Sequence, residues 1–162
     1  MNNKKETYEF DAIIIGAGIV GLAIAHELSA EYENILVIEK EITFGRHVSS
    51  RNSEVIHSGV YYKPGSLKAR LCIEGNRLMY DFARKYNINH NNCGKLIVIP
   101  TIEELPMLET LMHNGKQNGV KGLEIISGED VSQREPIIKA AGGLSVPSTG
   151  IIDSHGCMHK LE

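Results

Sequence analysis

A glycine-rich segment near the N-terminus has the spacing of a loop that holds a diphosphate. Gly16, Gly18 and Gly21 follow a short apolar segment and precede a stretch with helical periodicity. In such a loop the first glycine permits a tight turn, the second lets the backbone approach a pyrophosphate, and the third lets helix and strand pack closely. The helix begins at Ile19 and Val20, so its unpaired N–H groups offer a partial positive charge to the phosphate. The segment therefore predicts a dinucleotide-binding turn.

An acidic residue at the end of the next apolar segment completes this pattern. Glu39 closes residues 35–39, and it follows Gly21 by 18 residues (39 − 21). Its carboxylate can accept hydrogen bonds from both ribose hydroxyls of an adenosine, which argues against NADP. Lys40 beside it is a further candidate for cofactor contact. The pattern alone does not separate FAD from NAD, because both contain adenosine diphosphate, and a simple glycine-rich turn followed by an unrelated acid is the alternative.

A polar segment after this acid offers a second set of hydrogen-bond donors. Ser49, Ser50, Asn52 and Ser53 supply hydroxyl, amide and backbone donors where we expect a loop that enters a short helix. A diphosphate or a ribityl chain would be held by such donors. For each of the four side chains, simple capping of the helix is the other interpretation.

The elements that must position these residues follow from the apolar pattern. Residues 12–15 are β-branched without polar alternation, which predicts a parallel strand buried on both faces. A helix from about Ile19 and a second strand at 35–39 complete a strand–helix–strand unit of about 30 residues. Its crossover should be right-handed. The fold class is therefore α/β, a Rossmann-like unit that binds a dinucleotide.

The rest of the chain predicts a mixture of helices and strands. Leucine spacing indicates a helix over 66–86, with Gly75 where a neighbour packs closely. Strands are expected at 95–99 and 143–146. Capping patterns, which place helix starts, occur at Thr101 with Glu104, at Ser127 with Asp130, and at Asp153 or Ser154. These elements predict a mixed α+β arrangement after the strand–helix–strand unit.

Composition excludes several classes of protein. The 162 residues are 42% hydrophobic and 23% charged with a net charge of −3, which is typical of a globular domain. No basic stripe is present, so nucleic acid is not expected as a partner. The cysteines Cys72, Cys93 and Cys157 have no spacing for a metal, and we expect free thiols and no metal site. The apolar runs are too short for a transmembrane segment.

One long segment resembles a known family. Residues 49–72, SSRNSEVIHSGVYYKPGSLKARLC, are similar to the second signature of the D-amino-acid-oxidase-like flavoenzymes. More narrowly, they resemble L-2-hydroxyglutarate dehydrogenases and the related FAD-dependent glycerol-3-phosphate dehydrogenases. Residues 94–98 (GKLIV) and 148–155 (STGIIDSH) fit the same group. The resemblance covers nearly the whole chain after the first nine residues.

The resemblance implies a cofactor and a reaction. FAD is the expected cofactor, and the expected function is an oxidoreductase acting on the CH–OH group of a small 2-hydroxy acid such as L-2-hydroxyglutarate. Glycerol 3-phosphate or an amino acid is the alternative substrate. The loop of Ser49 would lie along FAD, and His57 would be a general base near the isoalloxazine. An ordinary packed or solvated histidine is the other interpretation of His57, and covalent FAD attachment through His47 is not expected.

The resemblance also implies an organisation and its limits. We expect a polar tail at 1–9, the N-terminal part of the FAD-binding domain at 10–88, and at 89–162 the first part of a substrate domain that returns toward the FAD domain. Family members are longer, so the chain is expected to be truncated and inactive alone, as a fragment that at most binds FAD or pairs with a complementing C-terminal half. The electron acceptor stays open. The expected location is the cytoplasm, or the inner face of the membrane if a quinone is the acceptor.

Overall fold

The computed structural model describes residues 7–162 and divides into two compact units. Unit 1 contains the described residues up to Ser53 together with residues 153–162, and unit 2 contains residues 54–152. Of the predicted polar tail, residues 1–6 lie outside the described residues. The division into an FAD-binding part at 10–88 and a substrate part at 89–162 stays a prediction.

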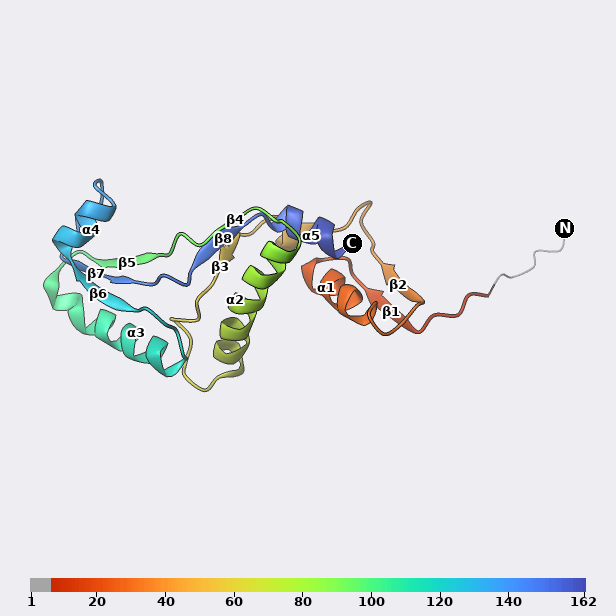
Figure 1. Cartoon of the computed structure of the whole chain (residues 1–162), viewed down its shortest axis with the longest axis horizontal. Helices are drawn as coiled ribbons and strands as arrows, with labels where there is room; N and C mark the ends of the chain where they lie inside the picture. The colour runs from red at the N-terminus through yellow and green to blue at the C-terminus, as the bar shows by residue number, and fades with distance from the viewer. Residues whose placement is uncertain (1–6) are drawn as a thin grey trace. The chain divides into compact units, whose positions relative to one another are not determined.

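Unit 1 contains the predicted strand–helix–strand unit. The strands β1 (Ala12–Ile15) and β2 (Ile35–Ile38) pair in parallel, with Ala12 opposite Ile35, and α1 (Ile19–Leu28) connects them (Figure 1). β-branched residues dominate both strands, because their side chains pack well on a pleated surface. These three predicted elements are confirmed, except that β2 ends one residue before Glu39.

The predicted burial of β1 on both faces is wrong. The side chains alternate between half-buried and exposed, and Ile13 and Ile15 are 55% and 87% exposed. Within the described part of unit 1, α1 packs on the strands, and the side of β1 that carries Ile13 and Ile15 is open. A strand of a parallel sheet is normally covered on both sides, so this apolar face is unusual.

A short core joins the two chain segments of unit 1. Leu22 of α1 and Met158 of α5 (Ser154–Leu161) are buried together with Ala17. The short helix expected where the loop 46–53 ends does not form, because Val55 and Ile56 belong to a strand. Within the loop itself there is a single 3-10 turn, η1 (His47–Ser50). This short segment is rich in hydroxyl and amide side chains, which bond to nearby backbone in turns and so compete with a longer helix.

Unit 2 contains an antiparallel sheet covered by a helix. The strand order is β5 (Leu96–Ile99), β7 (Gly142–Ser145) and β6 (Glu124–Ser127), and α3 (Leu105–Gln117) lies along this sheet (Figure 1). Its core is apolar and fully buried, and it includes Ile99, Leu108 and Leu144. The strands predicted at 95–99 and 143–146 are therefore confirmed to within one residue at each end.

The two predicted capping boxes have different outcomes. Ser127 Oγ accepts from Asp130 N at 3.1 Å, and Asp130 Oδ2 accepts from Ser127 N at 3.2 Å, so the box that starts α4 (Gly128–Arg134) is confirmed. The box of Thr101 with Glu104 is wrong, since Thr101 makes no side-chain capping bond. A 3-10 turn, η2 (Ile102–Glu104), separates Thr101 from α3, so its hydroxyl does not reach the first N–H groups of that helix.

A second small sheet in unit 2 was not predicted. Its strands β3 (Val55–Ile56), β8 (Gly150–Ile152) and β4 (His90–Asn91) pair antiparallel in this order. Each strand has only two or three residues, which is too few to show a period.

The long helix of unit 2 follows the prediction closely. α2 (Leu67–Lys85) is capped by Ser66, whose Oγ accepts from Ala69 N at 3.2 Å. The close neighbour predicted at Gly75 is absent, because no described atom lies within 4 Å of the position of an added Cβ. No helix within residues 7–162 is long and apolar enough to cross a membrane.

Candidate functional site

The glycine-rich loop in unit 1 has a backbone that other residues would not adopt easily. Gly16 has a φ of +103°, and its N–H donates to the carbonyl of Ile38 at 2.7 Å. A Cβ added at Gly21 would overlap the carbonyl oxygen of Gly16 and would lie 3.4 Å from Ile14 Cγ2. Gly16 therefore permits the turn, and Gly21 permits the close approach of α1 to the loop, as the sequence predicted.

The N-terminus of α1 lies beside the turn η1, which contains Ser49 and Ser50. Gly18 is the N-cap of α1 and offers no side-chain capping bond. Instead the N–H of Ile19 donates to Ser49 Oγ at 3.0 Å. A Cβ added at Gly18 would lie 3.1 Å from that hydroxyl. The fold thus brings Ser49 to the positive end of a helix, which is where a phosphate group binds most readily.

The Glu39 carboxylate is fixed beside the same loop. Its Oε2 accepts from the N–H of Ala17 at 2.7 Å, and its Oε1 accepts from the N–H of Glu41 at 2.9 Å. These bonds, the one from Glu41 first, hold the pKa of Glu39 below its ordinary value of 4.5. A carboxylate oxygen has two acceptor sites, so each can still accept a ribose hydroxyl. Lys40 is exposed, and its Nζ lies 3.7 Å from Glu41 Oε1.

A pH dependence follows from the lowered pKa of Glu39. Because the folded pKa is lowered, the stabilisation by Glu39 is present above pH 4.5 and is lost as the pH falls through the lower folded value. We expect Glu39→Gln to weaken FAD binding about tenfold, since a charged acceptor is lost, and to flatten the decline of binding below pH 4.5. Flavin released on titration to acid measures both effects. The exposed Glu27→Gln is the control, and an equal acid profile for wild type and Glu39→Gln would contradict this role.

The other predicted donors stabilise the turn η1 locally. Ser50 Oγ donates to the carbonyl of His47 at 3.3 Å, and Asn52 Nδ2 donates to the carbonyl of Ser49 at 3.0 Å. Ser53 is exposed. None of these side chains caps η1. The N-cap residue of η1 is Arg46, which makes no side-chain capping bond. Their contact with a cofactor stays a prediction.

One pair near the loop was not found from the sequence. His47 Nε2 lies 2.9 Å from Glu41 Oε1, and His47 has a φ of +58°, which is uncommon for a residue other than glycine. This pair holds the pKa of the Glu41 carboxyl below its ordinary value, the His47 hydrogen bond being the main cause. The two residues are six apart in an irregular segment, so no periodic pattern indicates their contact.

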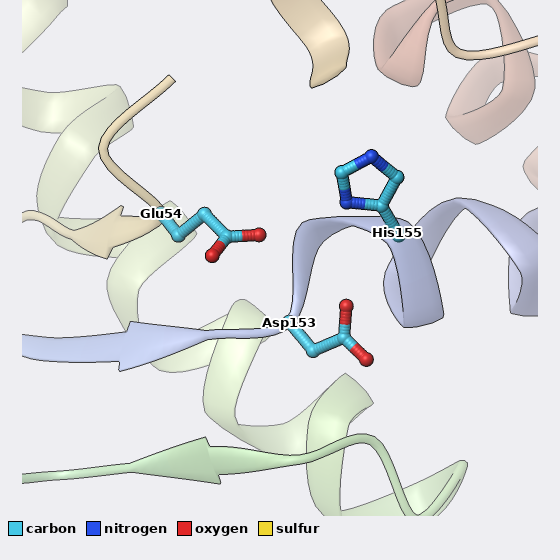
Figure 2. Close-up of side chains that lie close together, drawn as sticks. All are labelled: Glu54, Asp153 and His155. Atoms are coloured by element: carbon cyan, nitrogen blue, oxygen red, sulfur yellow. The ribbon is translucent and has the colours of Figure 1, made fainter. Parts of the chain in front are cut away.

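The last helix of unit 1 borders a small hollow beside η1. Asp153 caps α5, accepting from Gly156 N at 2.9 Å, and His155 lies in the first turn of that helix (Figure 2). The predicted cap at Asp153 is thus confirmed. The hollow has a volume of about 240 Å³, and its lining includes Arg46, Ser50 and His155. This volume is below the usual range for drug-sized ligands, so it can enclose only a part of a dinucleotide.

The predicted catalytic residue lies in the other unit. His57 follows β3 in unit 2 and is exposed, whereas Ser58 next to it and Val60 three residues after it are 3% and 1% exposed. The residues of unit 1 that the structure brings together are the glycine-rich loop, Glu39 and Ser49. Their donors and their carboxylate fit an adenosine diphosphate, which needs N–H groups at a helix start and an acid for the ribose.

Comparison with known proteins agrees with this geometry. Residues 11–162 match the model of the family described as DAO, FAD dependent oxidoreductase. The mitochondrial L-2-hydroxyglutarate dehydrogenase of Arabidopsis thaliana is 44% identical over 151 residues, which are 93% of this chain and 31% of that protein. The human mitochondrial L-2-hydroxyglutarate dehydrogenase is 45% identical over 149 residues, 91% of this chain and 32% of that protein. The chain therefore spans about a third of the length of these curated relatives.

Solved structures share the fold. The dithionite-reduced L-alpha-glycerophosphate oxidase from Mycoplasma pneumoniae with FAD bound has a TM-score of 0.87 and 28% identity, covering 95% of this chain and 42% of that one. Glycine oxidase from Geobacillus kaustophilus has a TM-score of 0.83 and 21% identity, covering 96% of this chain and 44% of that one. Because the glycine oxidase is only 21% identical to this chain, its similarity shows the fold alone.

Proposed function

The chain belongs to the FAD dependent oxidoreductase family, and on this premise we propose that it forms the FAD-binding front part of an enzyme that oxidises a small 2-hydroxy acid. The observation that carries the cofactor is the glycine-rich loop, with Glu39 bonded to the N–H of Ala17 and Ser49 bonded to the N–H of Ile19. L-2-hydroxyglutarate is the proposed substrate, because the curated relatives named for it are 44% and 45% identical over most of this chain.

Each predicted site residue has a role in this proposal. The N–H groups of Gly18 and Val20 face the diphosphate at the start of α1, and Gly16 and Gly21 keep the loop tight. The N–H of Ile19, which donates to Ser49 Oγ in the structure, exchanges this bond for one to the diphosphate. The Glu39 carboxylate accepts hydrogen bonds from the ribose hydroxyls, and the ammonium group of Lys40 adds positive charge near the cofactor. The remaining donors extend along the diphosphate and the ribityl chain, and they are Ser49, Ser50, Asn52 and Ser53.

His57 is the proposed general base. The hydroxyl proton of the substrate passes to an imidazole nitrogen of His57, while the α-hydrogen leaves with its electron pair as hydride, so the alcohol becomes a ketone. FAD, when bound, supplies the hydride acceptor. The exposure of His57 beside the buried Ser58 supports a role that needs contact with a ligand. A solvated histidine without a role is the alternative.

The substrate is tested by turnover of the full-length protein loaded with FAD. We expect reduction of a dye acceptor with L-2-hydroxyglutarate, and at most about a hundredth of that rate with the D-enantiomer, glycerol 3-phosphate or glycine, because correct orientation alone is worth this factor. Glycerol 3-phosphate is the matched competitor, since the FAD-bound glycerophosphate oxidase is 28% identical. Faster turnover of glycerol 3-phosphate would replace the proposed substrate, though not the proposed cofactor.

A second candidate function is FAD binding only together with a complementing polypeptide. The exposed Ile13 and Ile15 on one face of β1 favour it, because parallel strands are normally covered on both faces. In this case residues 1–162 alone would be inactive and would hold FAD weakly. The cytoplasmic location and the peripheral membrane location stay predictions, and the electron acceptor stays open. The relatives reported above are mitochondrial by name.

A further inference from the structure

The segment 57–62, which connects β3 to the turn before α2, is irregular, and its middle residues 58–60 are buried. Ser58 and Val60 are almost fully buried, and Gly59 has a φ of +85°. A Cβ added at Gly59 would lie 2.8 Å from Ile73 Cδ1 of α2. Because backbone carbonyls in such a segment have no strand partner, they need other donors when buried. Two asparagine side chains supply them.

Asn76 of α2 holds the His57 end of this segment. Its Nδ2 donates to the carbonyl of His57 at 3.0 Å and to the carbonyl of Ser148 at 2.9 Å. Tyr80, one turn later on α2, donates from its hydroxyl to the same Ser148 carbonyl at 3.3 Å. Asn76 thus ties the backbone of His57 both to α2 and to the turn that leads into β8.

Asn118, which follows α3, holds the other end. Its Nδ2 donates to the carbonyl of Gly59 at 3.1 Å and to the carbonyl of Tyr62 at 2.8 Å. Asn76 lies 19 residues after His57 and Asn118 lies 59 residues after Gly59, and they approach from α2 and from the end of α3. Together they satisfy three carbonyls of one segment of six residues, so its backbone is fixed from two sides.

We propose that Asn76 and Asn118 are positioning residues, and that Asn76 sets the place of the His57 imidazole for proton removal. This inference rests on the proposed function of His57. A primary amide has two N–H donors, so one asparagine can hold two carbonyls at once. A backbone held in this way fixes the position of the His57 Cα, and so limits the positions that the imidazole can reach, which a flexible loop would not ensure.

The hydrogen bonds themselves are tested by hydrogen exchange in the full-length protein loaded with FAD. We expect Asn76→Ala to speed amide exchange in residues 57–59, because it removes the bond to the His57 carbonyl together with the bond to Ser148. Asn118→Ala should speed exchange mainly in 59–62, because it removes the bonds to the carbonyls of Gly59 and Tyr62. Asn89→Ala removes an exposed amide of the same unit and is the control. Unchanged amide exchange over residues 57–62 in both Asn76→Ala and Asn118→Ala would overturn the proposal.

The catalytic consequence is tested by a double-mutant cycle in the same protein. Asn76→Ala should lower kcat about ten- to a hundredfold with unchanged FAD content, since a displacement of about 1 Å has effects of this size. In the His57→Ala background it should cause no further loss, because Asn76 acts through His57. The positioning role would be overturned if the losses in kcat of the two single variants multiply in the double variant. It would also be overturned if Asn76→Ala leaves kcat unchanged while His57→Ala lowers it.

The outcome separates this inference from the function on which it rests. If His57→Ala leaves kcat unchanged, the proposed role of His57 is wrong, and the positioning of His57 for catalysis is overturned with it. Faster amide exchange in Asn76→Ala would then still show that the asparagine side chains hold the backbone of the segment 57–62. Asn76→Asp is a second variant should Asn76→Ala fold poorly, because it keeps the side-chain volume and replaces the donors with acceptors.

Discussion

Gly21→Ala should leave the full-length protein without bound FAD and should destabilise unit 1. The added Cβ would overlap the carbonyl oxygen of Gly16, which is backbone and cannot rotate away as a side chain can. The loop must then move away from the start of α1, and the bond from Ile19 N to Ser49 Oγ is lost with it. Overpacking of this kind costs about 1–3 kcal/mol or more. Flavin absorbance per protein and thermal unfolding measure the two effects.

Gly75→Ala is the matched control for this substitution. Gly75 lies inside α2 with no described atom within 4 Å of the new Cβ. Alanine should therefore stabilise the helix by about 0.5–1 kcal/mol, because it loses less conformational entropy on folding than glycine. Full flavin content in Gly21→Ala would show that the loop does not hold the cofactor.

His57→Ala should lower kcat by about 10² or more while the FAD content stays normal. A general base removes the hydroxyl proton in the transition state, and its loss affects the chemical step more than substrate binding. Since His57 is exposed, alanine there leaves no cavity, and the stability of the fold should change little. Steady-state kinetics with L-2-hydroxyglutarate separate kcat from KM.

His113→Ala is the control for this prediction, because His113 is an exposed histidine on α3 of the same unit. It should leave kcat and KM unchanged. If His57→Ala behaves in the same way, His57 is an ordinary solvated residue and another group must accept the proton.

The extent of successful prediction depends on how local each signal is. The strand at Ala12–Ile15, the helix from Ile19 and the helix capped by Ser66 have continuous patterns and were predicted nearly to the residue. The strands Val55–Ile56 and Gly150–Ile152 exist because they pair with each other from distant parts of the chain. Such short strands have no period of their own, so the sequence alone does not indicate them.

The site shows the same limit. The glycine-rich loop and Glu39 form one contiguous pattern, so they were found together, although the bond from Ala17 N to Glu39 was not foreseen. Asn76 and Asn118 were missed, because they bind backbone carbonyls, and any residue can supply a carbonyl. The exposed face of β1 was also missed, since a run of apolar residues predicts burial without saying which element covers it.

Anaerobic titration of the full-length, FAD-loaded protein with L-2-hydroxyglutarate tests the central claim most directly, because it needs no electron acceptor. The flavin absorbance reports transfer of hydride from the substrate, and glycerol 3-phosphate and the D-enantiomer serve as parallel titrants. We predict that L-2-hydroxyglutarate bleaches the oxidised flavin bands at near-stoichiometric amounts, whereas the two parallel titrants leave them unchanged on the same timescale. Flavin that stays oxidised with L-2-hydroxyglutarate and is bleached by glycerol 3-phosphate would contradict the proposed reaction.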